Sequence, residues 1–245
     1  MSSSIETAKF YDNLMDGTEK RGIFGKSLRY NPAHVLQKPS VKKYFVDVIK
    51  SYLKKTDNVL DFGCGPGSFL AASAPFCGEI TGVDISQGFV STCQQTIDDL
   101  RIYNAKAMHI RPDVVPFADN TFDVIMMVGT IHHLENVKKS IEEALRVVKK
   151  GGRILIFEPN KLNPLIWLVH FLDKNERGLL KLGTPWKYQK ILATYMHIEH
   201  IKFNGIVIGP ESPVYHVSAE IINYRFLKYL LRWMNPQMFI TGIKK

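Results

Sequence analysis

Cysteine is scarce in this chain of 245 residues. The three present, Cys64, Cys77 and Cys93, form no CxxC pair and cannot all be bridged within one chain. This favours a reducing compartment and leaves no obvious zinc site. Long apolar runs are absent as well, because the longest, 164–172, is far too short to span a bilayer.

The first residues include an early acid, Glu6, and lack the apolar segment of a secretory signal. We therefore expect a cytoplasmic protein. Internal repeats and low-complexity tracts are also absent, and the 45% hydrophobic and 22% charged fractions are typical of a globular protein. At this length we expect one domain with a substantial core.

The net charge of +9 is unevenly distributed along the chain. Residues 1–55 carry +6, residues 56–160 carry −4 and residues 161–245 carry +7. Basic flanks can simply confer solubility. They can also meet an anionic partner such as a phosphorylated substrate, a membrane surface or RNA, and the charge alone leaves both interpretations open.

Hydrophobic patterning divides the single predicted domain into three parts. Residues 1–57 read as a mainly helical cap, with helical spacing over 41–50. From residue 58 to about 160, short apolar strands alternate with helices, which predicts a doubly wound α/β sheet with parallel strands. Residues 161–245 form an acceptor-side region with an inserted basic amphipathic helix at 219–234.

The expected elements follow from the same patterning. A helix is predicted over 140–149, ended by Gly151 and Gly152. The predicted strands are 58–62, 79–84, 106–110, 122–128, 153–157, 201–208 and 238–243.

A glycine-rich loop follows the first predicted strand. Residues 61–67 read Asp-Phe-Gly-Cys-Gly-Pro-Gly, and glycines at such a turn let a ligand approach the backbone closely. A dinucleotide fingerprint would need a third glycine where Ser68 stands, which makes a dehydrogenase the least favoured enzyme. A P-loop would need a GK[ST] ending, which is absent.

Aspartates stand at the carboxyl ends of three consecutive predicted strands, where ligands of such sheets bind. Asp84 is placed to accept the hydroxyls of a ribose. Asp113 could accept a hydrogen bond from an exocyclic amine such as that of adenine, and Asp61 could attract a ligand ammonium. Each alone is more often a cap or a turn residue, but three in succession indicate an adenosine site.

These motifs resemble, in order, those of class I S-adenosylmethionine-dependent methyltransferases over residues 40–160. Residues 59–67 resemble the family's motif I, 82–86 its acidic second motif, 112–117 its adenine-contact motif, 119–125 its fourth strand, and 145–153 the turn before its fifth strand. Overall, the chain most resembles the small-molecule branch of the family, which includes quinone-biosynthesis methyltransferases. The resemblance identifies the methyl donor and leaves the acceptor open.

The resemblance implies a seven-stranded Rossmann-like sheet of order 3-2-1-4-5-7-6, with the last strand antiparallel and helices on both faces. It implies S-adenosyl-L-methionine as cofactor, S-adenosyl-L-homocysteine as product and no metal. Residues near Val128 should lie beside the methyl donor. The complete set of expected cofactor-binding residues is Asp61, Gly63, Cys64, Gly65, Gly67, Asp84, Ile85, Asp113, Val114 and Val128.

Methyl transfer needs alignment and exclusion of water, and a base only where the acceptor must lose a proton. His132 and His133 follow the fourth strand at the mouth of the predicted site, and we expect the base to be one of them, with His132 favoured. The alternative is that one packs and the other lines the pocket. Glu158 is a second candidate, and Tyr11 and Tyr30 could close the site.

The range of possible methyl acceptors is narrowed mainly by motifs that the sequence lacks. No [DNS]PP[FYW] motif follows the fourth strand, and no Pro-Cys pair is present, which weakens methylation of nucleobases. We expect a small-molecule or lipid-like acceptor, modified at oxygen, with peripheral membrane contact left open. An RNA methyltransferase and a non-catalytic cofactor-binding protein remain as alternatives, although no RNA-binding motif is appended.

Overall fold

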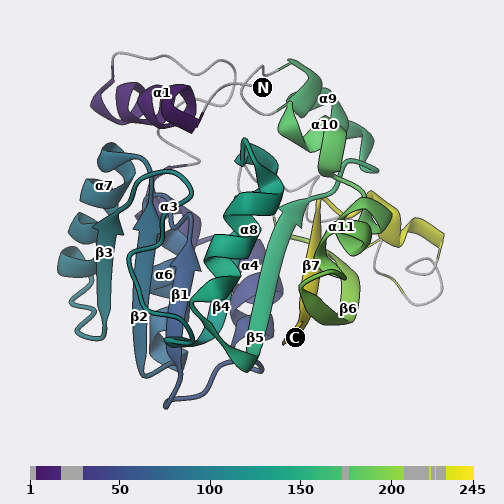
Figure 1. Ribbon diagram of the computed structural model, residues 1–245. Coiled ribbons are helices and arrows are strands. Elements are labelled where there is room, and N and C mark those ends of the chain that lie inside the picture. Colours follow the sequence, from purple (N-terminus) through teal and green to yellow (C-terminus); the bar gives the residue numbers. More distant parts are fainter. Residues whose placement is uncertain (1–3, 18–29, 173–176, 207–220, 222–223, 225–229) are drawn as a thin grey trace.

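A mixed β-sheet forms the centre of the molecule, and most of its strands point toward one edge (Figure 1). The computed structural model describes residues 4–17, 30–172, 177–206, 221, 224 and 230–245. Among these residues, the strands are β1 (Asn58–Phe62), β2 (Glu79–Asp84), β3 (Ala105–His109), β4 (Phe122–Val128), β5 (Val148–Pro159), β6 (Met196–Asn204) and β7 (Gln237–Lys244).

The sheet order is β3-β2-β1-β4-β5-β7-β6. Strands β1 to β5 pair in parallel, whereas β7 is antiparallel to both β5 and β6. This confirms the order and the antiparallel last strand that the resemblance implies. The order reverses between β1 and β4, and the carboxyl ends of strands at such a point are where ligands of open α/β sheets bind.

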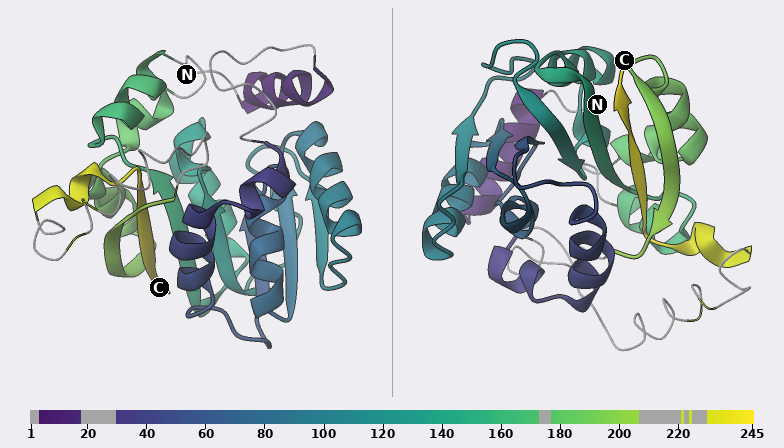
Figure 2. Two further views of the ribbon diagram at one scale, coloured as in Figure 1. Left: turned by 180° about the vertical axis from the view of Figure 1, so that it is seen from behind. Right: turned by 90° about the horizontal axis from the view of Figure 1, so that it is seen from below.

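Helices cover both faces of the sheet (Figure 2). One face carries α8 (Val137–Arg146) and α11 (Pro185–Leu192). The opposite face carries α3 (Pro32–Leu36), α4 (Pro39–Val41), the π-helical turn η1 (Lys42–Val46), α5 (Asp47–Ile49), α6 (Ser68–Ser73) and α7 (Gln87–Asp99). The short 3₁₀ turn η2 (Ala74–Phe76) follows α6.

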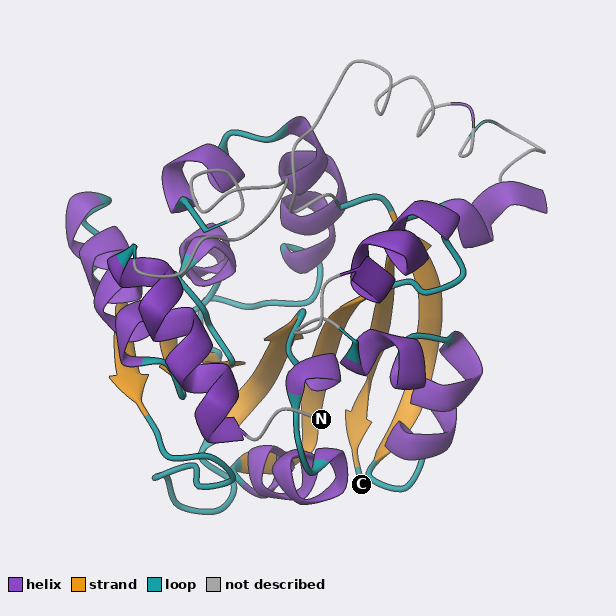
Figure 3. Ribbon diagram, turned by 90° about the horizontal axis from the view of Figure 1, so that it is seen from above, coloured by secondary structure: helices purple, strands orange, loops and turns teal. Residues whose placement is uncertain are grey.

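The remaining helices gather at the carboxyl edge, seen from above in Figure 3. They are α1 (Ser4–Asp16), the 3₁₀ turn η3 (Ile131–His133), α9 (Pro164–Leu172) and α10 (Gly178–Leu182), while η5 (Arg232–Met234) precedes β7. No helix among the described residues is long and apolar enough to cross a membrane.

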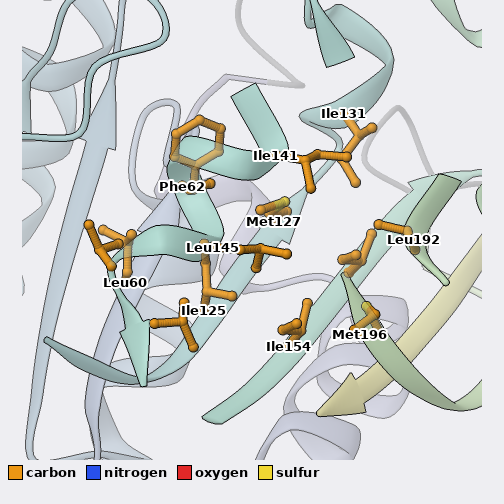
Figure 4. Packing of buried hydrophobic residues seen from close by; sticks show 14 of the residues in the cluster. Leu60, Phe62, Ile125, Met127, Ile131, Ile141, Leu145, Ile154, Leu192 and Met196 are labelled. Atoms are coloured by element: carbon orange, nitrogen blue, oxygen red, sulfur yellow. The ribbon is translucent and has the colours of Figure 1, made fainter. Parts of the chain in front are cut away.

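The core follows the two-residue period of buried strands. Leu60, Ile125 and Ile154 come from three neighbouring strands and pack with Leu145 of α8 (Figure 4). Their sequence neighbours, such as Val124, point to the other face and pack in a second buried cluster. Because both faces are covered, apolar residues lie on both sides of the central strands, which explains why they were visible in the sequence.

The predicted end of the helix after β4 is wrong. Helix α8 ends at Arg146, and Val148 already pairs with Phe122 in the sheet. Gly151 and Gly152 therefore lie within β5, at the point where its register against β4 shifts. Smaller differences are that β3 begins and ends one residue early, β5 begins five residues early and β6 covers 196–204. The predicted helix over 219–234 lies mostly outside the described residues.

Candidate active site

The loop between β1 and α6 adopts backbone conformations that favour glycine. Gly63, Gly65 and Gly67 have φ angles of +77°, +53° and +91°. The N–H groups of Gly63 and Cys64 donate to the carbonyl oxygen of Val83 at 2.8 and 3.0 Å. These bonds fix the loop against the end of β2, the strand that ends in Asp84.

The glycines of this region serve two different purposes. A Cβ on Gly63 or Gly67 would come within 2.4 or 2.7 Å of a neighbouring side-chain atom, so these positions are needed for packing. A Cβ on Gly65 or on Gly129 (φ +66°) would meet nothing within 4 Å, although both residues line a pocket at the carboxyl edge of the sheet. At those two positions the backbone is bare toward the pocket, as a closely approaching ligand requires.

Asp84 holds the loop and faces the same pocket. Its Oδ2 accepts from the N–H of Gly65 and its Oδ1 from the N–H of Ser86, both at 2.9 Å. Burial raises the pKa of this carboxyl, and the two backbone N–H groups partly offset the rise by stabilising the charge. The carboxylate is thus fixed in position before any ligand arrives.

Asp61 lies behind the loop rather than in the pocket lining. Its side chain is buried, and neither carboxylate oxygen has a hydrogen-bond partner within the described part of the chain. Burial, and next the charge of Asp84, raises the pKa of Asp61 to about 8. A buried acid without a partner is costly, and a nearby cation would relieve that cost.

The third aspartate lies at the far end of the pocket. Asp113 has φ +55°, accepts a hydrogen bond from the Ser140 hydroxyl and stands 3.6 Å from the Lys139 ammonium. Asp113 and Ser140 both line the pocket, as does Ile85. Val114 is 44% exposed and does not line it.

The pocket at the carboxyl edge has a volume of about 160 Å³. Its walls come from the glycine loop, from the ends of β2 and β4, and from α1. Of the expected cofactor-binding residues, it is lined by Gly63, Cys64, Gly65, Asp84, Ile85, Asp113 and Val128, whereas Asp61, Gly67 and Val114 lie outside its lining.

The rings of the two histidines of η3 lie 4.0 Å apart, but they differ in burial and in their partners. His133 lines the pocket, and its Nε2 lies 3.3 Å from the Tyr11 hydroxyl. His132 is 2% exposed and does not line the pocket; its Nδ1 lies 2.7 Å from Oε2 of Glu158. The structure therefore places His133, and not the favoured His132, in the lining of the pocket.

Glu158 is a buried acceptor at the end of β5. Its Oε1 accepts from the backbone N–H groups of Thr130 and Ile131 at 2.8 and 2.7 Å. Its Oε2 lies 2.7 Å from both His132 Nδ1 and the hydroxyl of Tyr188. Burial, followed by the adjacent Glu158 charge, raises the pKa of Tyr188 well above its usual value, so this phenol keeps its proton and donates a hydrogen bond to the carboxylate. One carboxylate thus fixes the whole turn that carries His133.

Helix α1 lies above the ends of β2 and β3 (Figure 1), and its residues Ser4, Thr7 and Tyr11 line the pocket. Asp12 of α1 accepts from the Ser86 hydroxyl at 2.7 Å and from the N–H of Gly88 at 2.9 Å. At its start, the backbone N–H and the hydroxyl of Ser4 donate to Glu135 at 2.8 and 3.1 Å. These contacts join the N-terminal helix to both sides of the pocket mouth.

An aromatic cluster lines the pocket beneath α1. Tyr11, Tyr30 and Phe89 all line it, with ring centroids 4.7 Å apart for Tyr11–Phe89 and 5.4 Å for Tyr30–Phe89. The two tyrosines were expected to close the site. Phe89 and Thr7, which also line it, were not anticipated; the position of Phe89 in the first turn after the β2 acid was the available signal.

Comparison with known proteins supports one interpretation of this site. Residues 60–156 match the family model described as a methyltransferase domain. An uncharacterised methyltransferase, YcgJ of Bacillus subtilis, is 31% identical over 100 residues, which are 41% of this chain and 40% of the relative. The chain therefore spans less than half the length of that relative. The ubiquinone/menaquinone biosynthesis C-methyltransferase UbiE of Klebsiella pneumoniae is 27% identical over 74% of this chain and 76% of its own.

Solved structures share the fold. A methyltransferase dependent on S-adenosylmethionine from Aquifex aeolicus superposes with a TM-score of 0.63 at 19% identity, over 87% of this chain and 98% of its own. The geranyl diphosphate C-methyltransferase of Streptomyces coelicolor, solved with S-adenosyl-L-homocysteine, gives 0.63 at 14% identity, over 99% and 97% of the two chains. At such identities the likeness concerns the fold.

Proposed function

We propose that the chain is a class I S-adenosylmethionine-dependent methyltransferase that transfers a methyl group to a small-molecule or lipid-linked acceptor, a proposal supported by the match of residues 60–156 to the methyltransferase domain. The observation that carries the proposal is the shared pocket. Asp84, Asp113, the bare backbone of Gly65 and an imidazole, that of His133, meet there at the carboxyl ends of neighbouring strands. Donor-binding groups and a group able to take a proton thus face one space.

The residues of the pocket fit S-adenosyl-L-methionine. Asp84 would hold the ribose hydroxyls, Asp113 with Ile85 the adenine, and the loop backbone around Gly65 the methionine part. Asp61 would gain the cationic neighbour that its buried carboxylate lacks. The bound cofactor supplies a methyl group on a sulfonium, which needs no further activation; the chain must align the acceptor and exclude water.

We place the acceptor on the η3 side, beneath α1. His133 stands there among Tyr11, Tyr30 and Phe89, which suits a flat, partly apolar molecule. We propose a hydroxyl oxygen as the acceptor atom, with its proton passing to His133. The relatives named as C-methyltransferases favour carbon as the second candidate. Analysis of the labelled product by NMR distinguishes the two.

We further propose that the chain works as one domain of three parts. Residues 1–57 contribute the cap that includes α1, residues 58–160 the cofactor-binding core, and residues 161–245 the acceptor-side region. Cytoplasm remains the proposed compartment. Supplying labelled S-adenosyl-L-methionine with separate lipid, small-metabolite and RNA extracts tests the acceptor class. Label in RNA alone would favour the RNA alternative, and cofactor binding without transfer to any extract would favour a non-catalytic protein.

Separate substitutions of the two histidines test which of them acts as the base. His133→Asn should lower kcat about 100-fold or more while the Kd for S-adenosyl-L-homocysteine stays within about twofold, because the ring faces the acceptor side. His132→Asn is the matched variant, and it should reduce the free energy of unfolding while leaving turnover of the folded enzyme intact. Wild-type turnover in His133→Asn, or loss of turnover in folded His132→Asn, would remove the assignment.

A further inference from the structure

Helix α9 exposes an unusually apolar surface. Its nine residues read Pro-Leu-Ile-Trp-Leu-Val-His-Phe-Leu, and only His170 is buried. Leu165 and Leu172 are 65% and 64% exposed. Single exposed apolar residues are common, but several on one short helix mark a contact surface.

The exposed side chains occupy one continuous side of α9. At 3.6 residues per turn, Leu165, Trp167, Leu168, Phe171 and Leu172 span an arc of about 160°. The rings of Trp167 and Phe171 stack, with centroids 5.2 Å apart and an interplanar angle of 10°. We call these five residues the α9 apolar face.

Basic residues border this face. Over residues 160–192 the sequence contains six lysines or arginines and two acids, Asp173 and Glu176, which gives this stretch a net charge of +4. Arg177 donates to the carbonyl oxygen of Phe171 at the end of α9. Lys161 bonds the carbonyl oxygen of Leu180, and burial together with the charge of Lys187 lowers the pKa of Lys161, so positive charges cluster beside α10.

We propose that the α9 apolar face, with its basic border, docks on an anionic lipid surface. A helix of nine residues is too short to cross a bilayer, but it can lie in the interface with its apolar side in the acyl boundary while cations meet phosphate head groups. Trp186 in α11 is 58% exposed, and tryptophan favours this boundary. A second copy of the chain fits less well, since the basic borders of two copies would repel each other.

The docking face is tied to the pocket. The His170 ring lies 5.9 Å from the His132 ring, and Gly178 at the start of α10 packs so closely that a Cβ would fall 1.7 Å from the carbonyl oxygen of His132. The turn that presents His133 is thus held by the elements that carry the face. Delivery of a lipid-soluble acceptor from the bilayer to this side of the pocket rests on the proposed function; docking itself does not.

Vesicle co-sedimentation tests the proposal. The probes are vesicles of phosphatidylcholine alone and of phosphatidylcholine with a quarter phosphatidylglycerol. The full chain should bind only the anionic vesicles, and added salt should weaken binding. Leu165→Glu with Leu172→Glu should lower the partition coefficient about tenfold or more.

The matched control is Leu100→Glu with Tyr103→Glu, which adds the same charge at exposed apolar residues between α7 and β3. It should bind vesicles much more strongly than the α9 variant. Unchanged affinity of both variants for S-adenosyl-L-homocysteine would show an intact cofactor site.

Failure of the wild-type chain to bind anionic vesicles, or equal loss in both variants, would overturn the proposal. So would a dimer in solution that the α9 variant converts to a monomer while its vesicle binding persists. Vesicle binding in a chain that transfers no methyl group would leave docking intact and refute only the proposed activity.

Discussion

Removal of the Glu158 carboxylate should cost much of the protein's stability. In Glu158→Ala four donors lose their acceptor, and three of those hydrogen bonds are buried: those from the N–H of Ile131, from His132 and from Tyr188. At about 1 kcal/mol for each unsatisfied buried donor, the lower end of the usual range, the loss is about 3 kcal/mol. A cavity adds to it. Domains commonly have only about 5–15 kcal/mol in total.

Glu158→Gln should cost less, about 1–2 kcal/mol. The amide oxygen can keep the backbone N–H groups of Thr130 and Ile131, while the Tyr188 hydroxyl rotates and the His132 ring changes tautomer to accept from the new amide. Only the strengthening that an ionised acceptor gives is then lost. The free energy of unfolding of Glu158→Ala should therefore lie well below that of Glu158→Gln, because the alanine leaves the hydrogen-bond donors without an acceptor.

Urea unfolding followed by tryptophan fluorescence measures both variants. Glu142→Ala is the matched control, since the Glu142 side chain is 49% exposed and its 3.9 Å ion pair with Lys138 lies on the surface. It should change the free energy of unfolding by less than about 0.5 kcal/mol. A loss below about 1 kcal/mol in Glu158→Ala, or one equal to that of the control, would refute the network as the support of the η3 turn.

Two further variants probe the cofactor end of the pocket. Between pH 5 and 8 the unfolded chain has released the Asp61 proton while the folded protein, with a pKa of about 8, retains it, so stability falls as pH rises. Asp61→Asn removes this loss of stability. The free energy of unfolding of the variant in urea without cofactor, relative to that of wild type, should rise by about 4 kcal/mol from pH 5 to 8. A difference between the two proteins that does not change with pH would contradict the raised pKa of Asp61. Gly65→Ala should abolish most binding of S-adenosyl-L-homocysteine in calorimetry, because its methyl group enters the pocket. Gly151→Ala is the matched control, because Gly151 also has a positive φ and open space around it but lies in β5. It should lose a similar amount of stability to backbone strain and bind S-adenosyl-L-homocysteine normally. Equal affinities of the two variants would exclude close approach of the ligand at Gly65.

The strands and the donor site were largely readable from the sequence. Strands β1, β2 and β4 match the predicted bounds because both faces of the sheet are covered, which places apolar residues on both sides of each strand. The glycine loop and Asp84 follow because a tight turn and a strand end are local features. Asp61 shows the limit: the sequence places it by the loop, but only packing shows that it lies behind the pocket wall, buried and without a partner.

The orientation of the two histidines was not readable, and the reason is physical. Both histidines follow the same strand and their ring centroids lie 4.0 Å apart, so their place in the sequence does not say which ring becomes buried. Which one does so depends on a partner far along the chain. Glu158, 26 residues away, draws His132 inward, and Tyr11, 122 residues away, meets His133 at the pocket. The sequence places a carboxylate at the end of β5 and two histidines shortly after β4, but only the packed structure shows which ring meets the carboxylate.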